Sequence, residues 1–222
     1  MFGSRSPQAI FPTHIWTHDL APDVSVPLNR RLTGILDKVT SPLPPSPPGG
    51  NWQTDQTLHK LPEVSDLMDA FLSASAGILT ELEVEYREIE ISGCWANISP
   101  KGAVHLPHSH PNNYLSGIYY VHTADGADSV TFYDPSDING IFAPQLRAAN
   151  KYNYKEYTIP AKPGRLVVFP SWLRHGVPEN TSDQFRISIS FNIVFSDFAE
   201  TIAIPKWDGL PLNLDALREQ EE

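Results

Sequence analysis

The stretch from Phe185 to Phe195 constrains the fold more than any other part of this chain, because it alternates strictly. Every second residue is apolar: Ile187, Ile189, Phe191 and Ile193. The residues between them are polar: Arg186, Ser188, Ser190 and Asn192. Successive side chains of a β-strand point to opposite faces, so the stretch predicts a strand with one apolar and one polar face. The inward face of a small barrel is normally filled by apolar side chains unless it lines a cavity. We therefore expect the apolar face to pack on helices and the polar face to line a cavity.

Further short strands are predicted between residues 86 and 198. The segments rich in β-branched and aromatic residues are 86–97, 114–122, 129–133, 157–159 and 165–169. Turn residues such as Pro163-Gly164 separate them. Many short strands with turns between them are typical of a sandwich or a closed barrel.

The first 85 residues predict an early strand at 8–18 and two helices, at 27–39 and 63–83. The second helix carries an apolar stripe at helical spacing, from Val64 to Leu82, which suits packing against the outside of a sheet. The proline-rich segment 41–50 predicts a loop. We expect one domain over 1–222: supporting elements in 1–85, a β core in 86–198 and a tail in 199–222.

Composition narrows the function classes. The 222 residues carry a formal net charge of −10, which disfavours nucleic acid or an anionic membrane as the main partner. No apolar run reaches the ~20 residues of a membrane helix, and the N-terminus lacks an apolar signal core. The one cysteine, Cys94, excludes a disulfide framework within a single chain. These features predict a cytoplasmic protein, and they do not indicate its oligomeric state.

Three histidines form the strongest candidate for a chemical site. His108 and His110 are two residues apart, so on a strand both imidazoles would reach one point. His175, from a distant segment, would complete a set of three nitrogens around a transition metal such as iron, copper, nickel or zinc. His105 lies three residues before His108; a solvated loop histidine is the favoured interpretation, and support of a ligand or acid–base catalysis is the alternative.

Arg186 predicts the binding of an acid. A buried arginine needs an anionic partner, and its planar guanidinium matches a carboxylate with two parallel hydrogen bonds. On the polar face of its strand, Arg186 would receive a carboxylate ligand, with Ser188 donating a second hydrogen bond. The alternative is a structural ion pair with an Asp or Glu of the protein.

These pieces together resemble the Fe(II)- and 2-oxoglutarate-dependent oxygenases. The motifs that carry the resemblance are His108-Ser109-His110, Gly117-Ile118-Tyr119-Tyr120-Val121, Phe169-Pro170-Ser171-Trp172, His175 and Arg186-Ile187-Ser188. They look like a bacterial branch of the 2-oxoglutarate oxygenases akin to prolyl hydroxylases. The resemblance covers residues 90–195 and implies a mainly β fold with flanking helices, the double-stranded β-helix or jelly roll.

The resemblance also implies roles for individual residues. His108 and His175 would be iron ligands, and Arg186 would bind the distal carboxylate of 2-oxoglutarate with help from Ser188 or Tyr120. Asn97 and Trp95, on the strand before the histidine motif, would line the cosubstrate pocket. The alternative for Trp95 is packing in the core.

His110 departs from the family pattern, which usually has Asp or Glu at that position. Three neutral histidines would leave the metal more positive by one unit, which favours an anionic oxoacid. Three alternatives stay open. His110 could be displaced, with a water or Asp134 in its place; the protein could be a cupin-like dioxygenase that does not use 2-oxoglutarate; or it could sense metal or 2-oxoglutarate without catalysis. The presence of Arg186 favours 2-oxoglutarate.

The activity that the resemblance implies is an oxidoreductase with Fe(II) as cofactor and 2-oxoglutarate and O₂ as cosubstrates. It would couple oxidative decarboxylation of 2-oxoglutarate to oxidation of a small molecule or a peptide, with hydroxylation as the default outcome. The loops at 134–154 and 42–50 are the candidates for substrate selection.

Overall fold

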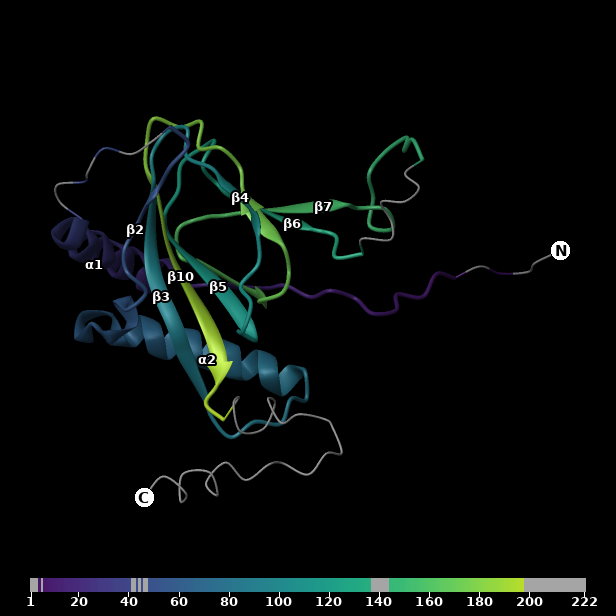
Figure 1. The fold of residues 1–222 in the computed structure, drawn as a ribbon, viewed down its shortest axis with the longest axis horizontal. Helices are drawn as coiled ribbons and strands as arrows, with labels where there is room; N and C mark the ends of the chain where they lie inside the picture. The colour runs from purple at the N-terminus through teal and green to yellow at the C-terminus, as the bar shows by residue number, and fades with distance from the viewer. Residues whose placement is uncertain are drawn as a thin grey trace, which may run out of the picture.

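Two antiparallel β-sheets form the core of the protein (Figure 1). The computed structural model describes residue 4 and residues 6–40, 43, 45, 48–136 and 144–197. In order across the six-stranded sheet, the strands are β1 (Trp16–Asp19), β8 (Arg165–Pro170), β5 (Leu115–His122), β10 (Arg186–Phe195), β3 (Ile89–Ser99) and β2 (Trp52–Gln53). The four-stranded sheet has the order β4 (His105–His108), β9 (His175–Val177), β6 (Ser129–Tyr133) and β7 (Glu156–Pro160). Every pairing between neighbouring strands is antiparallel.

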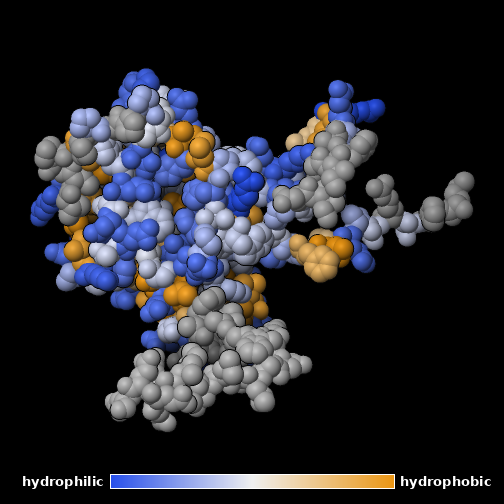
Figure 2. Space-filling view, in the orientation of Figure 1, coloured by the Kyte–Doolittle hydropathy of each residue, from blue (hydrophilic) through white to orange (hydrophobic). Residues whose placement is uncertain are grey.

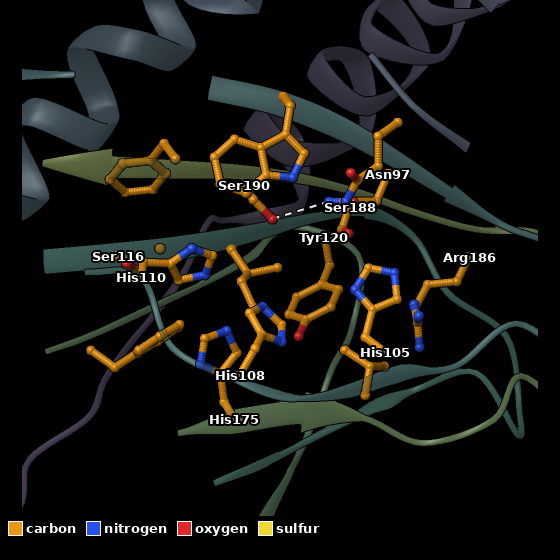
Figure 3. A pocket seen from close by; sticks show the side chains of 17 residues that line it. Asn97, His105, His108, His110, Ser116, Tyr120, His175, Arg186, Ser188 and Ser190 are labelled. Carbon is orange, nitrogen blue, oxygen red and sulfur yellow. Dashed lines mark hydrogen bonds between the residues drawn. The ribbon is translucent and has the colours of Figure 1, made fainter. Parts of the chain in front are cut away.

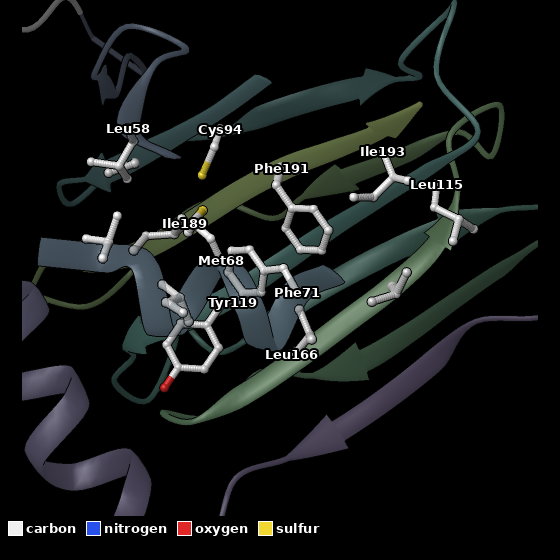
Figure 4. Packing of buried hydrophobic residues seen from close by; sticks show 14 of the residues in the cluster. Leu58, Met68, Phe71, Cys94, Leu115, Tyr119, Leu166, Ile189, Phe191 and Ile193 are labelled. Carbon is white, nitrogen blue, oxygen red and sulfur yellow. The ribbon is translucent and has the colours of Figure 1, made fainter. Parts of the chain in front are cut away.

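In the described part of the chain, two α-helices cover one face of the six-stranded sheet. They are α1 (Pro22–Thr40) and α2 (Ser65–Glu81), and two short 3₁₀ turns, Leu58–Lys60 and Pro62–Val64, precede α2. The apolar face of β10 packs on α2 as its alternation predicts: Ile189 and Phe191 are fully buried, and the Phe191 ring stacks on that of Phe71 with centroids 4.1 Å apart (Figure 4). On the face shown in Figure 2, hydrophilic residues predominate and apolar ones occur in small groups.

The polar face of β10 turns the other way, toward the four-stranded sheet. A cavity between the sheets is lined by residues of both, including Arg186, Ser188 and Ser190 of β10. A second apolar cluster closes the interior beside it; its buried members are Ile118, Tyr120, Val130, Phe132, Ile159, Ala161, Val167, Phe169 and Leu173. The expected architecture, a jelly roll with helices outside, is confirmed.

The predicted boundaries differ from the observed ones mainly near the N-terminus. The strand expected at 8–18 is confined to Trp16–Asp19, and the helix expected from residue 27 begins at Pro22. Proline suits the first turn of a helix, where its missing N–H is not needed. Half of the proline-rich segment 41–50 and the whole tail 199–222 lie outside the described residues. None of the helices described is long and apolar enough to cross a membrane.

Candidate metal centre and adjoining cavity

Three histidines converge at one end of the cavity, as the sequence predicts (Figure 3). One ring nitrogen from each of His108, His110 and His175 lies within 4.8 Å of the other two. His108 on β4 and His175 on β9 are cross-strand partners, and their ring centroids are 4.5 Å apart. The antiparallel pairing of β4 and β9 therefore places two of the three side chains by backbone register alone.

His110 reaches the cluster by a different route from the one that the sequence predicts. β4 ends at His108, so the two-residue period of a strand does not place His110. The backbone N–H of His110 instead donates to the carbonyl of Ser171 at 2.8 Å. Pro111 follows, which has no N–H to continue a ladder, and Asn112 adopts a positive φ of 65° in the turn. A turn, not a strand, holds the third imidazole.

The hydrogen bonds of two rings determine which nitrogen is free. Nδ1 of His108 lies 2.8 Å from the carbonyl of Leu106, and Nδ1 of His175 lies 2.9 Å from the carbonyl of Leu173. A carbonyl only accepts, so Nδ1 carries the hydrogen in both rings. The Nε2 lone pair is then left for a metal, in the arrangement in which a backbone carbonyl orients a ligating histidine.

Burial favours the neutral form of the enclosed rings. Desolvation, followed by the charge of His108, lowers the pKa of His110 to about 4. Desolvation is also the largest cause that lowers the pKa of His175 to about 3, against the opposing hydrogen bond to Leu173. Both rings are therefore neutral at pH 7, which is the form that binds a metal ion.

Arg186 lies at the other end of the cavity, and it is only 3% exposed. Its Nη2 donates to the hydroxyl of Ser99 at 3.2 Å. In the described part of the chain, no Asp or Glu forms an ion pair with it. Desolvation lowers the pKa of Arg186, but a guanidinium stays charged under any physiological condition. The cavity thus contains a buried positive charge.

The other predicted cosubstrate residues differ in whether their polar atoms already have hydrogen-bond partners. Tyr120 and Ser188 line the cavity, and the hydroxyl of Tyr120 is buried without a hydrogen-bond partner. Asn97 also lines it, but its side chain already accepts from Gln53 at 2.7 Å and donates to Ser190 at 3.1 Å. The side chain of Asn97 therefore links neighbouring strands beside the cavity, whereas the Tyr120 hydroxyl is available to bind a ligand.

His105 is the residue that sequence reasoning missed, since a solvated loop was its favoured interpretation. It is the first residue of β4 and lines the cavity between Tyr120 and Arg186 (Figure 3). An odd spacing of three would put His105 and His108 on opposite faces of a regular strand. The register of β4 against β9 shifts between these two residues, and such an irregularity turns both side chains inward.

Asp134, the alternative metal ligand, is not part of the histidine cluster and does not line its cavity. It lines a separate cavity together with Tyr133, Lys155 and Tyr157. Among the described residues that line the cavity of the three histidines, none is Asp or Glu. Three imidazole nitrogens at one end and a buried guanidinium at the other fit a transition-metal ion together with an anionic ligand.

Sequence comparison identifies a family. Residues 93–192 match the model of a family described as "Putative 2OG-Fe(II) oxygenase". The matched segment runs from β3 to β10 and contains all three histidines as well as His105, Tyr120 and Arg186. No curated protein matches the sequence.

Solved structures share the fold at low sequence identity. The epimerase SnoN in complex with Fe³⁺, alpha ketoglutarate and nogalamycin RO is 12% identical, with a TM-score of 0.60 over 90% of this chain and 89% of that one. A prolyl hydroxylase from Trichoplax adhaerens, in complex with a peptide fragment of the hypoxia inducible factor oxygen degradation domain, is 11% identical, with a TM-score of 0.58 over 86% and 87%.

A third structure is HygX from Streptomyces hygroscopicus with nickel and 2-oxoglutarate bound, 11% identical, with a TM-score of 0.56 over 83% of both chains. These likenesses support the jelly-roll fold, while the family match rests on the sequence of the strands that build the cavity. Over residues 93–192 the chain is similar to the Fe(II)- and 2-oxoglutarate-dependent oxygenases, and the three histidines and Arg186 of the cavity lie within this stretch.

Proposed function

We propose that the protein is an oxygenase with Fe(II) as cofactor and 2-oxoglutarate and O₂ as cosubstrates. In this proposal His108, His110 and His175 are the iron ligands, and Arg186 binds the distal carboxylate of 2-oxoglutarate. One observation carries the proposal: a cluster of three histidine nitrogens and an arginine without a carboxylate partner lie at opposite ends of a single cavity. A molecule with an oxoacid group at one end and a carboxylate at the other matches this arrangement.

Charge supports a dicarboxylate. Three neutral imidazoles add no negative charge to the metal, and Arg186 adds a positive one. Among the described residues that line the cavity, no Asp or Glu offsets this charge. Burying uncompensated charge is costly, so the cavity favours a ligand that brings two negative charges.

The protein's own groups bind, orient and desolvate the cosubstrate. The carbonyls of Leu106 and Leu173 orient two of the ligands, and Arg186 with the Tyr120 hydroxyl anchors the far carboxylate. Iron in such a site supplies the activation of O₂ that couples decarboxylation of the oxoacid to oxidation of a C–H bond. Hydroxylation is the outcome that we propose for this chain.

The substrate is proposed to be a small molecule or a peptide that approaches beside His110. Trp172 is 56% exposed and directly follows Ser171, whose carbonyl holds the His110 backbone. Two of the related structures contain, respectively, a small molecule and a peptide.

We also propose that the enzyme acts in the cytoplasm, in keeping with its free, buried Cys94 thiol, which cell fractionation would test.

Turnover of 2-oxoglutarate tests the proposal. Purified protein supplied with Fe(II), 2-oxoglutarate and O₂ should release succinate, and slow release without a primary substrate is enough for this test. The His175→Ala variant should release none, and Arg186→Ala should raise the KM for 2-oxoglutarate by about 100-fold, since a charge-assisted pair is lost.

Arg31→Ala is the matched control, because Arg31 pairs with Asp66 on the helical side, away from the cavity. It should leave the KM unchanged. Wild-type protein that binds Fe(II) and 2-oxoglutarate but never forms succinate would contradict the oxygenase assignment and favour a sensor. An unchanged KM in Arg186→Ala would remove that residue from carboxylate binding.

A further inference from the structure

Two polar atoms near Arg186 are buried without a hydrogen-bond partner. They are Nε2 of His105 and the hydroxyl oxygen of Tyr120. A buried polar atom without a partner costs free energy, and in a native protein it commonly marks a place where a ligand or water completes the hydrogen bond. Both atoms belong to residues that line the cavity of the three histidines.

These atoms lie around the guanidinium, at the end of the cavity away from the three histidines. Figure 3 shows the His105 ring beside Arg186, with the Tyr120 ring on its other side. The charge of Arg186 acts on both neighbours: it is among the causes that lower the pKa of His105 to about 4, after desolvation, and it also opposes the rise in the pKa of Tyr120. One positive charge and two unused polar groups therefore surround the same space.

His105 is separate from the metal cluster. Its ring centroid is 6.5 Å from that of His108, and it is not among the residues whose nitrogens converge. The register of β4 shifts between His105 and His108. The His105 side chain points along the cavity toward Arg186. It is therefore placed to contact the distal part of a ligand that the metal holds at the other end.

We propose that His105 is a specificity-determining residue, which donates a hydrogen bond from Nε2–H to the same carboxylate that Arg186 binds. The proposal deepens the proposed function and rests on it. A neutral imidazole suits this role, because it adds a directed donor without adding a further buried charge. The group recognised is a carboxylate, so His105 should discriminate dicarboxylic from monocarboxylic 2-oxoacids.

A pair of oxoacids separates the two ends of the cavity. 2-Oxopentanoate keeps the oxoacid group of 2-oxoglutarate but has a methyl group in place of the distal carboxylate. The experiment is calorimetric titration of each acid into Fe(II)-loaded protein without oxygen, for the wild type, His105→Phe and His105→Gln. Phenylalanine keeps the ring volume without a donor, and glutamine places an amide N–H near the position of Nε2.

We expect His105→Phe to weaken 2-oxoglutarate binding by about 10- to 100-fold, the range of one hydrogen bond to a charged group. Binding of 2-oxopentanoate should stay within about 3-fold of the wild type, since it lacks the group that His105 contacts. His105→Gln should recover most of the lost affinity. The control is His122→Phe, because His122 bonds to Gln184 and does not line the cavity.

Different failures have different meanings. Equal weakening of both acids in His105→Phe, or of neither, would overturn the role of His105 while leaving the oxygenase assignment intact. A glutamine variant as weak as the phenylalanine variant would overturn the donor role. If His105→Phe does not load iron, His105→Gln decides alone. A wild type that binds both acids equally, or neither, would contradict the proposed function itself.

Discussion

At the scale of single residues, the centre is defined by which nitrogens are already occupied. Nδ1 of His108 and Nδ1 of His175 each donate a hydrogen bond to a backbone carbonyl. The Nε2 atom of each ring is therefore left with a lone pair that can bind a metal. The three rings, 4.5 to 5.2 Å apart between centroids, therefore suit the metal site that we propose. Three rings without a carboxylate make the electrostatics of the site differ from those of a two-histidine, one-carboxylate triad.

The His110→Asp variant tests this electrostatic difference. An aspartate there would cancel one unit of positive charge at the metal, a few ångströms from a bound oxoacid. We expect the variant to bind Fe(II) but to bind 2-oxoglutarate about 10- to 100-fold more weakly, because charge attraction is strong where water is excluded. Anaerobic calorimetry on the iron-loaded variant measures this affinity.

His110→Asn is the control, since asparagine has the same shape as aspartate without its charge. The asparagine variant should retain more 2-oxoglutarate affinity than the aspartate variant. Tighter binding of 2-oxoglutarate by His110→Asp than by the wild type would show that charge at this position does not control cosubstrate affinity.

The sequence predicts the residues of the site better than their geometry. The convergence of His108, His110 and His175 was predicted, but for His110 by a strand period that the structure replaces with a turn. His105 escaped prediction because its odd spacing from His108 suggests the opposite face, and only the register shift in β4 turns it inward. Spacing rules hold for regular strands and fail where a strand bulges.

At the scale of secondary-structure elements, β10 joins the core to the cavity. It pairs with β3 on one side and β5 on the other, which makes it central in the sheet. The sequence predicts this strand because its residues alternate between apolar ones that pack on α2 and polar ones that line the cavity. The sequence does not predict the bounds of β4, because the strand has only four residues and one of them is Pro107.

Gly117 on β5 is needed for the packing of β10 on α2. It is the cross-strand partner of Phe191, and a Cβ added at Gly117 would overlap the Phe191 ring. That ring is stacked on Phe71 and cannot easily retreat. We expect Gly117→Ala to lower the free energy of unfolding by about 1–3 kcal/mol, the usual cost of overpacking a core. Urea denaturation followed by circular dichroism measures this change.

Gly77→Ala is the matched control, because Gly77 lies within α2 and an added Cβ meets nothing within 4 Å. Alanine favours the helix, so this variant should be more stable than the wild type by about 0.5–1 kcal/mol. Equal stability of Gly117→Ala and the wild type would show that the Phe191 ring can move, and that the β5–β10 contact is looser than it appears in the structure.

At the scale of the whole molecule, the two sheets provide the two ends of one binding site. The histidines come from β4, β9 and the turn after β4, whereas Arg186 and Ser188 come from β10 of the larger sheet. In the proposed complex, a dicarboxylate bound at both ends would bridge the two sheets. The helices contribute no residue to the described cavity lining and only cover the outer face of the larger sheet.

The fold class was predictable because the hydrophobic period changes between the two halves of the chain. Helical spacing in residues 63–83 corresponds to α2, and the two-residue alternation later corresponds to strands. The order of strands in each sheet was not predictable, because β1 pairs with β8 and β2 with β3 through contacts between distant segments. Local patterns carry little information about such partners.

The central claim is that the three histidines hold iron to which 2-oxoglutarate binds, and anaerobic visible absorption tests it most directly. Protein loaded with Fe(II) should gain a metal-to-ligand charge-transfer band when 2-oxoglutarate is added, because the oxoacid chelates the metal. The band should be absent in His175→Ala and should need more 2-oxoglutarate to saturate in Arg186→Ala. Iron bound at full stoichiometry with no new band, or a band that persists in His175→Ala, would contradict the account.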